Sequence, residues 1–131
     1  MRLLLLLPLT LLLACGSPSG GVGSNRPEND LQISIDRGDG STPESYTLVC
    51  AGAVEGSHPR AEQACAHLTS LPAPVAPIPA DAMCTQQYGG PETARVTGQW
   101  AGQPVDLALS RTNGCYISQW ESLGPLLSFD A

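Results

Sequence analysis

The chain has 131 residues, with 12 Asp and Glu side chains against 6 basic ones, and its formal net charge at pH 7 is −6. An acidic protein has no electrostatic reason to bind nucleic acid, because the phosphate backbone attracts basic surfaces. The same charge offers no basic patch to a membrane surface, so any attachment to a membrane would have to come from a lipid.

The first part of the chain has the pattern of an export signal. Arg2 precedes the apolar segment Leu3–Leu13, which is too short to cross a bilayer but fits the hydrophobic region of a signal peptide. The segment ends in Leu-Leu-Ala directly before Cys15, which looks like a bacterial lipobox. We therefore predict a signal peptide over residues 1–14, lipidation of Cys15, and a lipoprotein on the outer face of the cell membrane. The alternative is an ordinary signal peptide with an incidental cysteine, which would make the protein extracellular.

The remainder divides into a tether and one domain. Residues 15–30 hold the lipidated cysteine and a segment rich in Gly, Ser, Pro and Asn, which cannot bury a core and predicts a flexible tether. Residues 31–131 are long enough for one domain with a modest core. Four cysteines in a small exported domain predict two disulfides, and their spacing leaves three pairings open. Because there is no Cys-x-x-Cys pair, we expect neither a metal site nor a cofactor. The four cysteines are Cys50, Cys65, Cys84 and Cys115.

The first half of the domain predicts a hairpin followed by a helix. Apolar and polar residues alternate over residues 31–36 and return over 44–50, and a turn-rich segment with Asp-Gly separates the two. We expect these strands to pair. Ser57 is then a candidate N-cap, and the apolar residues after it have the spacing of one helical face. Those residues are Ala61, Ala64, Cys65 and Leu68.

The second half predicts a long loop and a second hairpin. Prolines over residues 71–83 exclude a helix or an inner strand. Alternation over residues 94–100 and 105–109 predicts two more strands. Residues 116–122 are compatible with a short helix, and 126–129 with a last strand. Together these elements predict an α+β domain with a mostly antiparallel sheet of about five strands, one clear helix and one short helix.

The sequence lacks the patterns that usually carry catalysis. It contains no Gly-x-Ser-x-Gly elbow, no His-Glu-x-x-His pair and no phosphate-binding loop. His58 lies at the start of the predicted helix, where we interpret it as a surface or capping residue. We therefore predict that the protein is not an enzyme.

Residues 83–91 have the composition of a presented peptide. The segment is polar, contains Gly and Pro, and lies between the proline-rich loop and a predicted strand. Cys84 fixes its start, so we expect an exposed segment that is restrained at both ends. A plain surface loop beside a structural disulfide would have the same composition.

Several separate motifs follow one another along the domain. They are Tyr46–Cys50, Gly56–Pro59, Ala64–Ala66, Met83–Thr85, Tyr88, Pro91, Val96–Gly102 and Asn113–Cys115. In their order and spacing, the chain from about residue 31 onward resembles the bacterial subtilisin inhibitor-like family. This resemblance implies an inhibitor of serine proteases that acts by the substrate-like standard mechanism.

The resemblance also implies how the cysteines pair. In the family the first cysteine joins the second and the third joins the fourth, which gives Cys50–Cys65 and Cys84–Cys115 here. The second disulfide would hold the exposed loop to the body of the domain. Asn113 matches a family asparagine that supports this loop by hydrogen bonds.

The family's reactive bond lies two residues after the third cysteine, which places it between Gln86 and Gln87. Gln86 would enter the primary specificity pocket of the protease. The remaining protease-contact residues would lie on either side of this bond. They are Met83, Cys84 and Thr85 on the acyl side and Tyr88 on the leaving side.

Two departures from the family pattern concern potency. Where family members usually have Met, Lys or Arg, this chain has Gln86, so we expect subtilisin-like proteases rather than trypsin-like ones as partners. Gly89 and Gly90 stand where the family has one residue before the proline, and two glycines in series would loosen the leaving side of the loop.

These departures motivate an alternative, a non-inhibitory, envelope-anchored binding module that keeps the inhibitor fold. A third hypothesis follows from relatives that are transglutaminase substrates, with Gln86 and Gln87 as acyl donors. Relatives form dimers through their sheet faces, and the sequence neither favours nor excludes a homodimer here.

Overall fold

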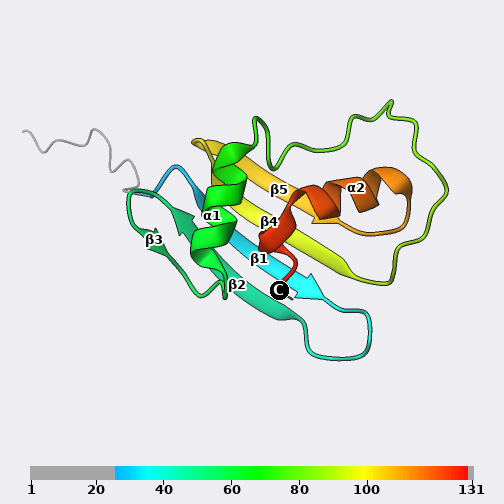
Figure 1. Ribbon diagram of the computed structural model, residues 1–131, viewed down its shortest axis with the longest axis horizontal. Coiled ribbons are helices and arrows are strands. Elements are labelled where there is room, and N and C mark those ends of the chain that lie inside the picture. The colour runs from blue at the N-terminus through cyan, green and yellow to red at the C-terminus, as the bar shows by residue number, and fades with distance from the viewer. Residues whose placement is uncertain (1–25, 130–131) are drawn as a thin grey trace, which may run out of the picture.

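The computed structural model describes residues 26–129, so the predicted signal peptide, Cys15 and most of the tether lie outside the described residues. Five strands form one sheet in the order β3-β2-β1-β4-β5, and all neighbours are antiparallel. Both helices lie on the same face of this sheet (Figure 1). The predicted α+β class and the predicted number of strands are confirmed. The elements are β1 (Asp30–Asp36), β2 (Glu44–Cys50), β3 (Val54–Glu55), α1 (Ala61–Ser70), β4 (Thr93–Trp100), β5 (Gln103–Leu109), α2 (Gly114–Ser122) and the 3₁₀ helix η1 (Gly124–Leu126).

The core lies between the sheet and the helices because each inner strand buries alternate residues. The central strand β1 buries Leu31, Ile33 and Ile35, while Gln32 and Ser34 between them are exposed. Each fully buried aliphatic side chain stabilises the fold by about 1.5–3 kcal/mol. The larger buried side chains from other segments are Leu48, Leu68, Val96, Leu107, Leu109, Trp120, Leu123, Leu126 and Leu127. Among the described residues, no helix has the length and apolarity needed to cross a bilayer.

The predicted last strand over residues 126–129 is wrong. Leu126 belongs to η1, and both it and Leu127 are fully buried. Two consecutive buried residues fit a helical turn packed on a core, whereas a strand would point them to opposite faces. The fifth strand is instead the short β3, which pairs with β2 at the edge of the sheet.

The predicted start of α1 is also wrong. The N-cap is Arg60, which makes no side-chain capping hydrogen bond. Ser57 is engaged elsewhere: its Oγ accepts a hydrogen bond from the backbone N–H of Thr47 at 3.0 Å, and its own N–H donates to Thr47 Oγ1 at 3.0 Å. The serine therefore ties the segment before α1 to β2 rather than capping the helix.

His58 is a core residue, which corrects its interpretation as a surface residue. Its ring is only 4% exposed and meets the rings of Tyr46 and Phe129 edge to face. Nδ1 accepts a hydrogen bond from the N–H of Arg60 at 3.0 Å, so Nε2 carries the proton and donates to the carbonyl O of Leu126 at 2.9 Å. Burial lowers the pKa of His58, because the charged ring would lose its hydration.

Part of the segment predicted to be a tether is bonded to the sheet. The side chain of Asn29 donates to the carbonyl O of Cys50 at 3.1 Å and accepts from the N–H of Ala101 at 2.7 Å. The N–H of Gly102 donates to the carbonyl O of Glu28 at 3.1 Å. These contacts connect the chain before β1 to the ends of β2 and β4.

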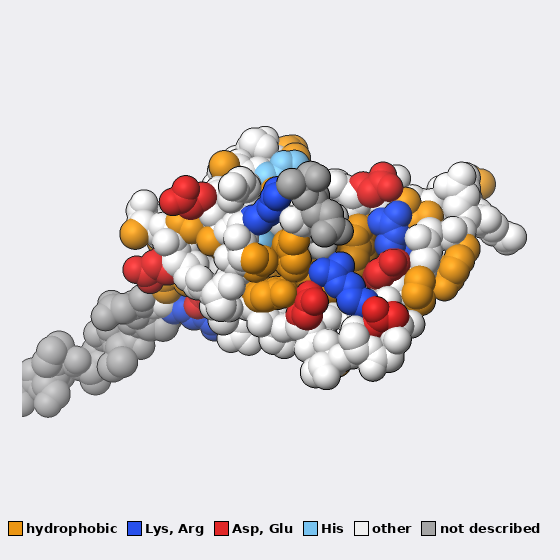
Figure 2. Space-filling model, turned by 60° about the horizontal axis from the view of Figure 1, so that its bottom comes forward, with side chains coloured by type: hydrophobic (Ala, Val, Ile, Leu, Met, Phe, Trp, Pro, Cys, Tyr) orange, Lys and Arg blue, Asp and Glu red, His pale blue; other side chains and the backbone are white. Residues whose placement is uncertain are grey.

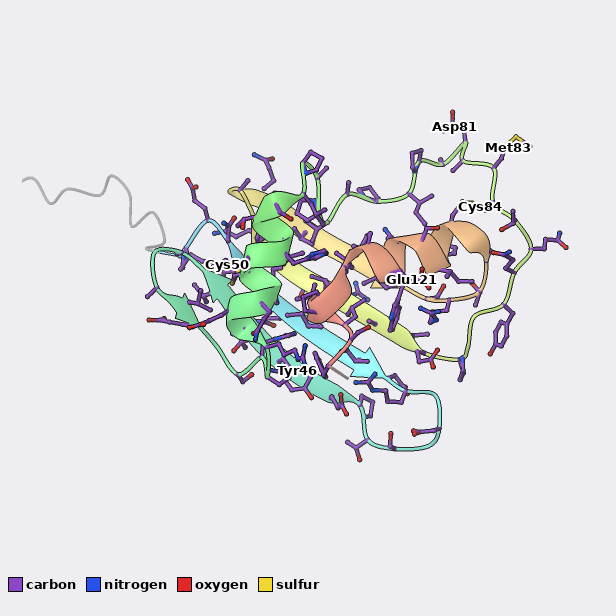
Figure 3. The ribbon with its side chains drawn as sticks, in the orientation of Figure 1. Tyr46, Cys50, Asp81, Met83, Cys84 and Glu121 are labelled. Atoms are coloured by element: carbon purple, nitrogen blue, oxygen red, sulfur yellow. A yellow bond between two sulfur atoms is a disulfide. The ribbon has the colours of Figure 1, made fainter. Side chains whose placement is uncertain are left out.

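Two disulfides fasten the domain, and the pairing that the resemblance implied is confirmed. Cys50 at the end of β2 is bonded to Cys65 in α1, with a Cα–Cα distance of 5.5 Å. Cys84 is bonded to Cys115 in α2, with a Cα–Cα distance of 5.2 Å. Figure 3 shows Cys50 and Cys84 at opposite ends of the molecule, so one disulfide serves the core and the other the long loop.

Candidate functional site

The loop between α1 and β4 presents the predicted site residues to solvent. Residues 83–91 contain no helix or strand, and Gln86 and Gln87 are both exposed. Met83 is 98% exposed and Tyr88 is 71% exposed. In Figure 3 this loop runs outside α2, and the Met83 side chain points away from the domain. Large apolar side chains this exposed, on both sides of a short polar segment, are available to a partner surface.

The predicted acyl side of the Gln86–Gln87 bond is held to the start of α2. The Cys84–Cys115 disulfide provides a covalent connection. One residue later, the carbonyl O of Thr85 accepts a hydrogen bond from the N–H of Gly114 at 2.9 Å. This side of the loop therefore has a covalent and a hydrogen-bonded attachment to the same helix turn.

The predicted leaving side of this bond is held by Arg111. The N–H of Gly89 donates to the backbone carbonyl O of Arg111 at 2.7 Å, and Nε of Arg111 donates to the carbonyl O of Gly89 at 3.2 Å. A Cβ placed on Gly89 would lie 2.9 Å from Cγ1 of Ile117 and 3.1 Å from Nε of Arg111. Glycine therefore lets the loop approach both side chains closely, and both hydrogen bonds depend on this approach.

Gly90 has a different role from Gly89. Its φ is +140°, a backbone conformation that residues other than glycine rarely adopt. A Cβ at this position would also collide with the carboxylate of Glu92. The two glycines are thus each required by a close contact at the end of the loop. The expected loosening of the leaving side is not what the geometry shows, because Gly89 is bonded through both its N–H and its carbonyl.

Asn113 supports the loop less directly than the resemblance implied. It is the N-cap of α2, and its Oδ1 accepts a hydrogen bond from the N–H of Tyr116 at 3.0 Å. Within residues 26–129, the Asn113 side chain makes no hydrogen bond to residues 83–91. Asn113 instead fixes the helix turn that carries Gly114 and Cys115, which are the two attachment points of the acyl side.

Sequence reasoning missed Arg111 and Ile117, although they contact the loop on its leaving side. Arg111 bonds to Gly89, a residue 22 positions earlier in the chain. No short motif joins positions so far apart, so only the fold brings them together. The one feature of the sequence that could have pointed to Arg111 is its place two residues before the Asn-Gly-Cys motif.

The charges near the site are mixed in sign. Figure 2 shows acidic and basic side chains interspersed on the face that it displays. Among the described residues, no group of three or more His, Cys, Asp or Glu side chains is placed to hold a metal ion. Residues 83–91 themselves are uncharged, so the loop exposes its backbone and uncharged side chains.

The fold and the site together define a class of protein, namely a small disulfide-bonded α+β domain that presents one exposed loop held at both ends. More particularly, the chain belongs to the subtilisin inhibitor-like family, whose model matches residues 28–113. This family consists of inhibitors rather than enzymes.

Similar proteins come from Streptomyces. The subtilisin inhibitor of Streptomyces violaceus is 33% identical over 88 residues, which cover 65% of this chain and 60% of that protein. Subtilisin inhibitor-like protein 3 of Streptomyces coelicolor is 35% identical over 73 residues, which cover 54% of this chain and 67% of that protein. The chain thus spans less than two thirds of the length of the first relative.

Among solved structures, sermetstatin of Streptomyces caespitosus, solved in complex with Bacillus licheniformis subtilisin, is similar in part. The sequence identity is 26% and the TM-score is 0.49, over 76% of this chain and 97% of that chain.

Proposed function

We propose that this protein inhibits subtilisin-like serine proteases by the substrate-like standard mechanism, with Gln86–Gln87 as the reactive bond. The relatives named as subtilisin inhibitors support the choice of partner. The observation that carries the proposal is the attachment of the loop on both sides of this bond: to Gly114 through Thr85, and to Arg111 through Gly89.

The physical basis is preorganisation. A free peptide loses conformational entropy when it enters the groove of a protease, whereas a loop already held in shape loses little, so more of the contact energy appears as affinity. Once the bond is cleaved, the held amine stays next to the acyl-enzyme and competes with water for it. A protease would then be occupied by a substrate that it cannot release as two separate pieces.

Gln86 sets the expected specificity. Its side chain is exposed and uncharged. A trypsin-like pocket selects a cationic side chain through a buried carboxylate, so a neutral amide leaves that carboxylate unpaired and binds poorly. Subtilisin-like proteases with broad pockets are therefore the expected targets.

The direct test is a titration of residues 16–131 against a fixed concentration of subtilisin. We expect stoichiometric loss of protease activity at micromolar protein. Full activity at that concentration would refute the proposal for subtilisin. Rapid and permanent cleavage after Gln86 without inhibition would instead favour the non-inhibitory binding module.

A second test moves the specificity. Gln86→Lys places a cation at the predicted primary position and is expected to create inhibition of trypsin. Gln32→Lys on the open face of the sheet adds the same charge to another exposed glutamine and controls for net charge. If both variants leave trypsin equally active, the reactive bond lies elsewhere.

We also propose that lipid on Cys15 holds the inhibitor at the outer face of the cell membrane. The support is the apolar segment that ends in Leu-Leu-Ala before this cysteine. In cells fed an alkyne-labelled fatty acid, the protein is expected to be labelled and to stay with the membrane fraction. Cys15→Ala should abolish the label, and a labelled Cys15→Ala protein would contradict lipidation at this residue.

A further inference from the structure

The two sides of the Gln86–Gln87 bond are held by different means. The acyl side is covalently fixed by the Cys84–Cys115 disulfide. On the leaving side, the hydrogen bonds found within residues 26–129 that hold the loop before β4 join Gly89 to Arg111: the Gly89 N–H donates to the Arg111 carbonyl, and Nε of Arg111 donates to the Gly89 carbonyl. If the bond is cut, the segment from Gln87 remains joined to β4 through the chain, and the two hydrogen bonds between Gly89 and Arg111 are what hold its first residues in place.

We propose that the Arg111 side chain is a positioning residue that keeps the leaving side of the loop in register, and so favours resynthesis of the bond over its hydrolysis. This inference rests on the proposed inhibitory function, which it deepens.

Arg111 is itself held in position by its neighbours. Its side chain is only 20% exposed, and its guanidinium carbon lies 5.9 Å from the centre of the Trp120 ring, which belongs to the core. Nη2 lies 3.6 Å from a carboxylate oxygen of Glu121. A cation over an aromatic face and beside a carboxylate is attracted to both, so the long side chain is restrained before the loop contacts it.

The position of Glu92 also favours a positively charged side chain at residue 111. Its Oε2 is buried and has no hydrogen-bond partner among the described residues, and Nε of Arg111 lies 3.9 Å away. A buried carboxylate oxygen without a hydrogen bond is costly unless a positive charge lies close by. Arg111 supplies that charge where the loop turns into β4, and the same Nε donates to the carbonyl O of Gly89.

The consequence for the reaction follows from where the cut falls. The serine hydroxyl of the protease adds to the carbonyl of Gln86, the C–N bond to Gln87 breaks, and the Gln87 nitrogen leaves as an amine with the proton of the serine. Resynthesis needs this amine to attack the ester and return the proton to the serine. Only Gln87 and Tyr88 separate the amine from Gly89, a span of about 7 Å at most. An amine tethered so closely has a high effective concentration, which free water cannot match if the tether holds.

The experiment compares three variants of the exported protein. Arg111→Ala removes the side chain but leaves the backbone carbonyl that accepts from Gly89. Arg111→Met with Glu92→Gln keeps the bulk over Trp120 and removes both charges, in case the single variant is destabilised by the unpaired Glu92. Arg95→Ala is the matched control, because Arg95 forms an exposed ion pair with Asp106 on the other face of the sheet, at 2.8 Å.

Two readouts are expected to change in both Arg111 variants. The amide hydrogen of Gly89 keeps its backbone acceptor, but it should exchange with solvent at least tenfold faster in the absence of any protease, because the loop opens more often once the side-chain bond to the Gly89 carbonyl is lost. With catalytic amounts of subtilisin, the equilibrium ratio of cleaved to intact chain should rise by about 10- to 100-fold, as expected for loss of a hydrogen bond from a charged group. Arg95→Ala should match the unmodified protein in both readouts, and thermal unfolding verifies that each variant is folded.

The outcomes separate this inference from the proposed function. If the unmodified protein does not inhibit subtilisin, the proposed function fails, while faster exchange at Gly89 in the Arg111 variants would still support the positioning role. If exchange at Gly89 equals that of Arg95→Ala, the positioning role is overturned. If exchange rises but the ratio of cleaved to intact chain does not, Arg111 holds the loop without governing resynthesis, and the inference is overturned.

Discussion

Gly89→Ala distinguishes two opposite descriptions of the leaving side. If Gly89 is a flexible point in a slack loop, alanine restricts the free chain and should tighten binding by about 0.4–1 kcal/mol. If Gly89 is instead the residue that allows close packing on Ile117, alanine should push the loop away and weaken binding. The sign of the change therefore decides between the two descriptions.

The structure gives the size of the expected effect. A Cβ at this position would lie 2.9 Å from Cγ1 and 3.0 Å from Cδ1 of Ile117. Ordinary carbon contacts are about 3.5–4.0 Å, so the loop is expected to move by about 0.5–1 Å unless the partly buried Ile117 side chain rotates away from it. Such a shift takes the 2.7 Å hydrogen bond from Gly89 to Arg111 to the limit of a good N–H···O distance, near 3.2 Å. Overpacking of this kind costs about 1–3 kcal/mol, or about 5- to 150-fold in Kd.

The assay is inhibition of subtilisin by Gly89→Ala, with the dissociation constant measured by titration. Gly102→Ala, between β4 and β5, is the control for replacing a glycine outside the loop, because a Cβ there would meet nothing within 4 Å and its φ of +75° imposes backbone strain without a collision. In Gly89→Ala combined with Ile117→Ala, the collision with Ile117 is removed, so much of the affinity should return. Equal or tighter binding by Gly89→Ala alone would refute the packing argument.

Three further predictions concern stability. The lowered pKa of His58 means that the folded chain binds this proton less readily than the unfolded chain does; the contribution to stability is intact above the unfolded pKa of about 6.5 and is lost as the pH falls below it. Thermal unfolding between pH 7.5 and pH 5 should therefore show a falling midpoint that His58→Gln flattens, and an unchanged profile in that variant would assign the loss to other groups. Replacing Cys84 and Cys115 together by serine opens a loop with a sequence separation of 31 and should cost up to about 3.7 kcal/mol by the chain-entropy estimate. Urea unfolding measures this cost, and a loss below about 1 kcal/mol would show that the loop is already restrained without the disulfide. Asn113→Ala removes the N-cap of α2 and should cost about 0.5–2 kcal/mol in the same assay, whereas Asn113→Asp keeps the acceptor and should cost little; equal losses would indicate that the cap hydrogen bond is unimportant.

Local patterns in the sequence predicted most of the sheet. Residues 31–36 alternate strictly between apolar and polar, and β1 buries one set and exposes the other. The same period identified β2, β4 and β5 to within a few residues. Period and turn chemistry act between near neighbours, so they can be read from a single chain.

The same reasoning failed where a distant contact overrides a local preference. Ser57 has the chemistry of an N-cap, but its hydroxyl is bonded to Thr47 on the neighbouring strand. The apolar pair Leu126 and Leu127 resembles the start of a strand, but both side chains are buried in the core in a helical turn. In both cases the competing partner lies far away in the sequence.

The sequence by itself determined the α+β class, the position of the long loop and, through its family motifs, the pairing of the cysteines; the same motifs predict Gln86–Gln87 as the reactive bond. Only the tertiary structure decided how that loop is held. Gly89, Glu92 and Trp120 meet at Arg111 because β5 and α2 bring the end of the loop against the start of the helix. Such contacts depend on the packed fold rather than on residue spacing. For that reason the two glycines predicted a loose end of the loop, whereas in the structure Gly89 is hydrogen-bonded and closely packed.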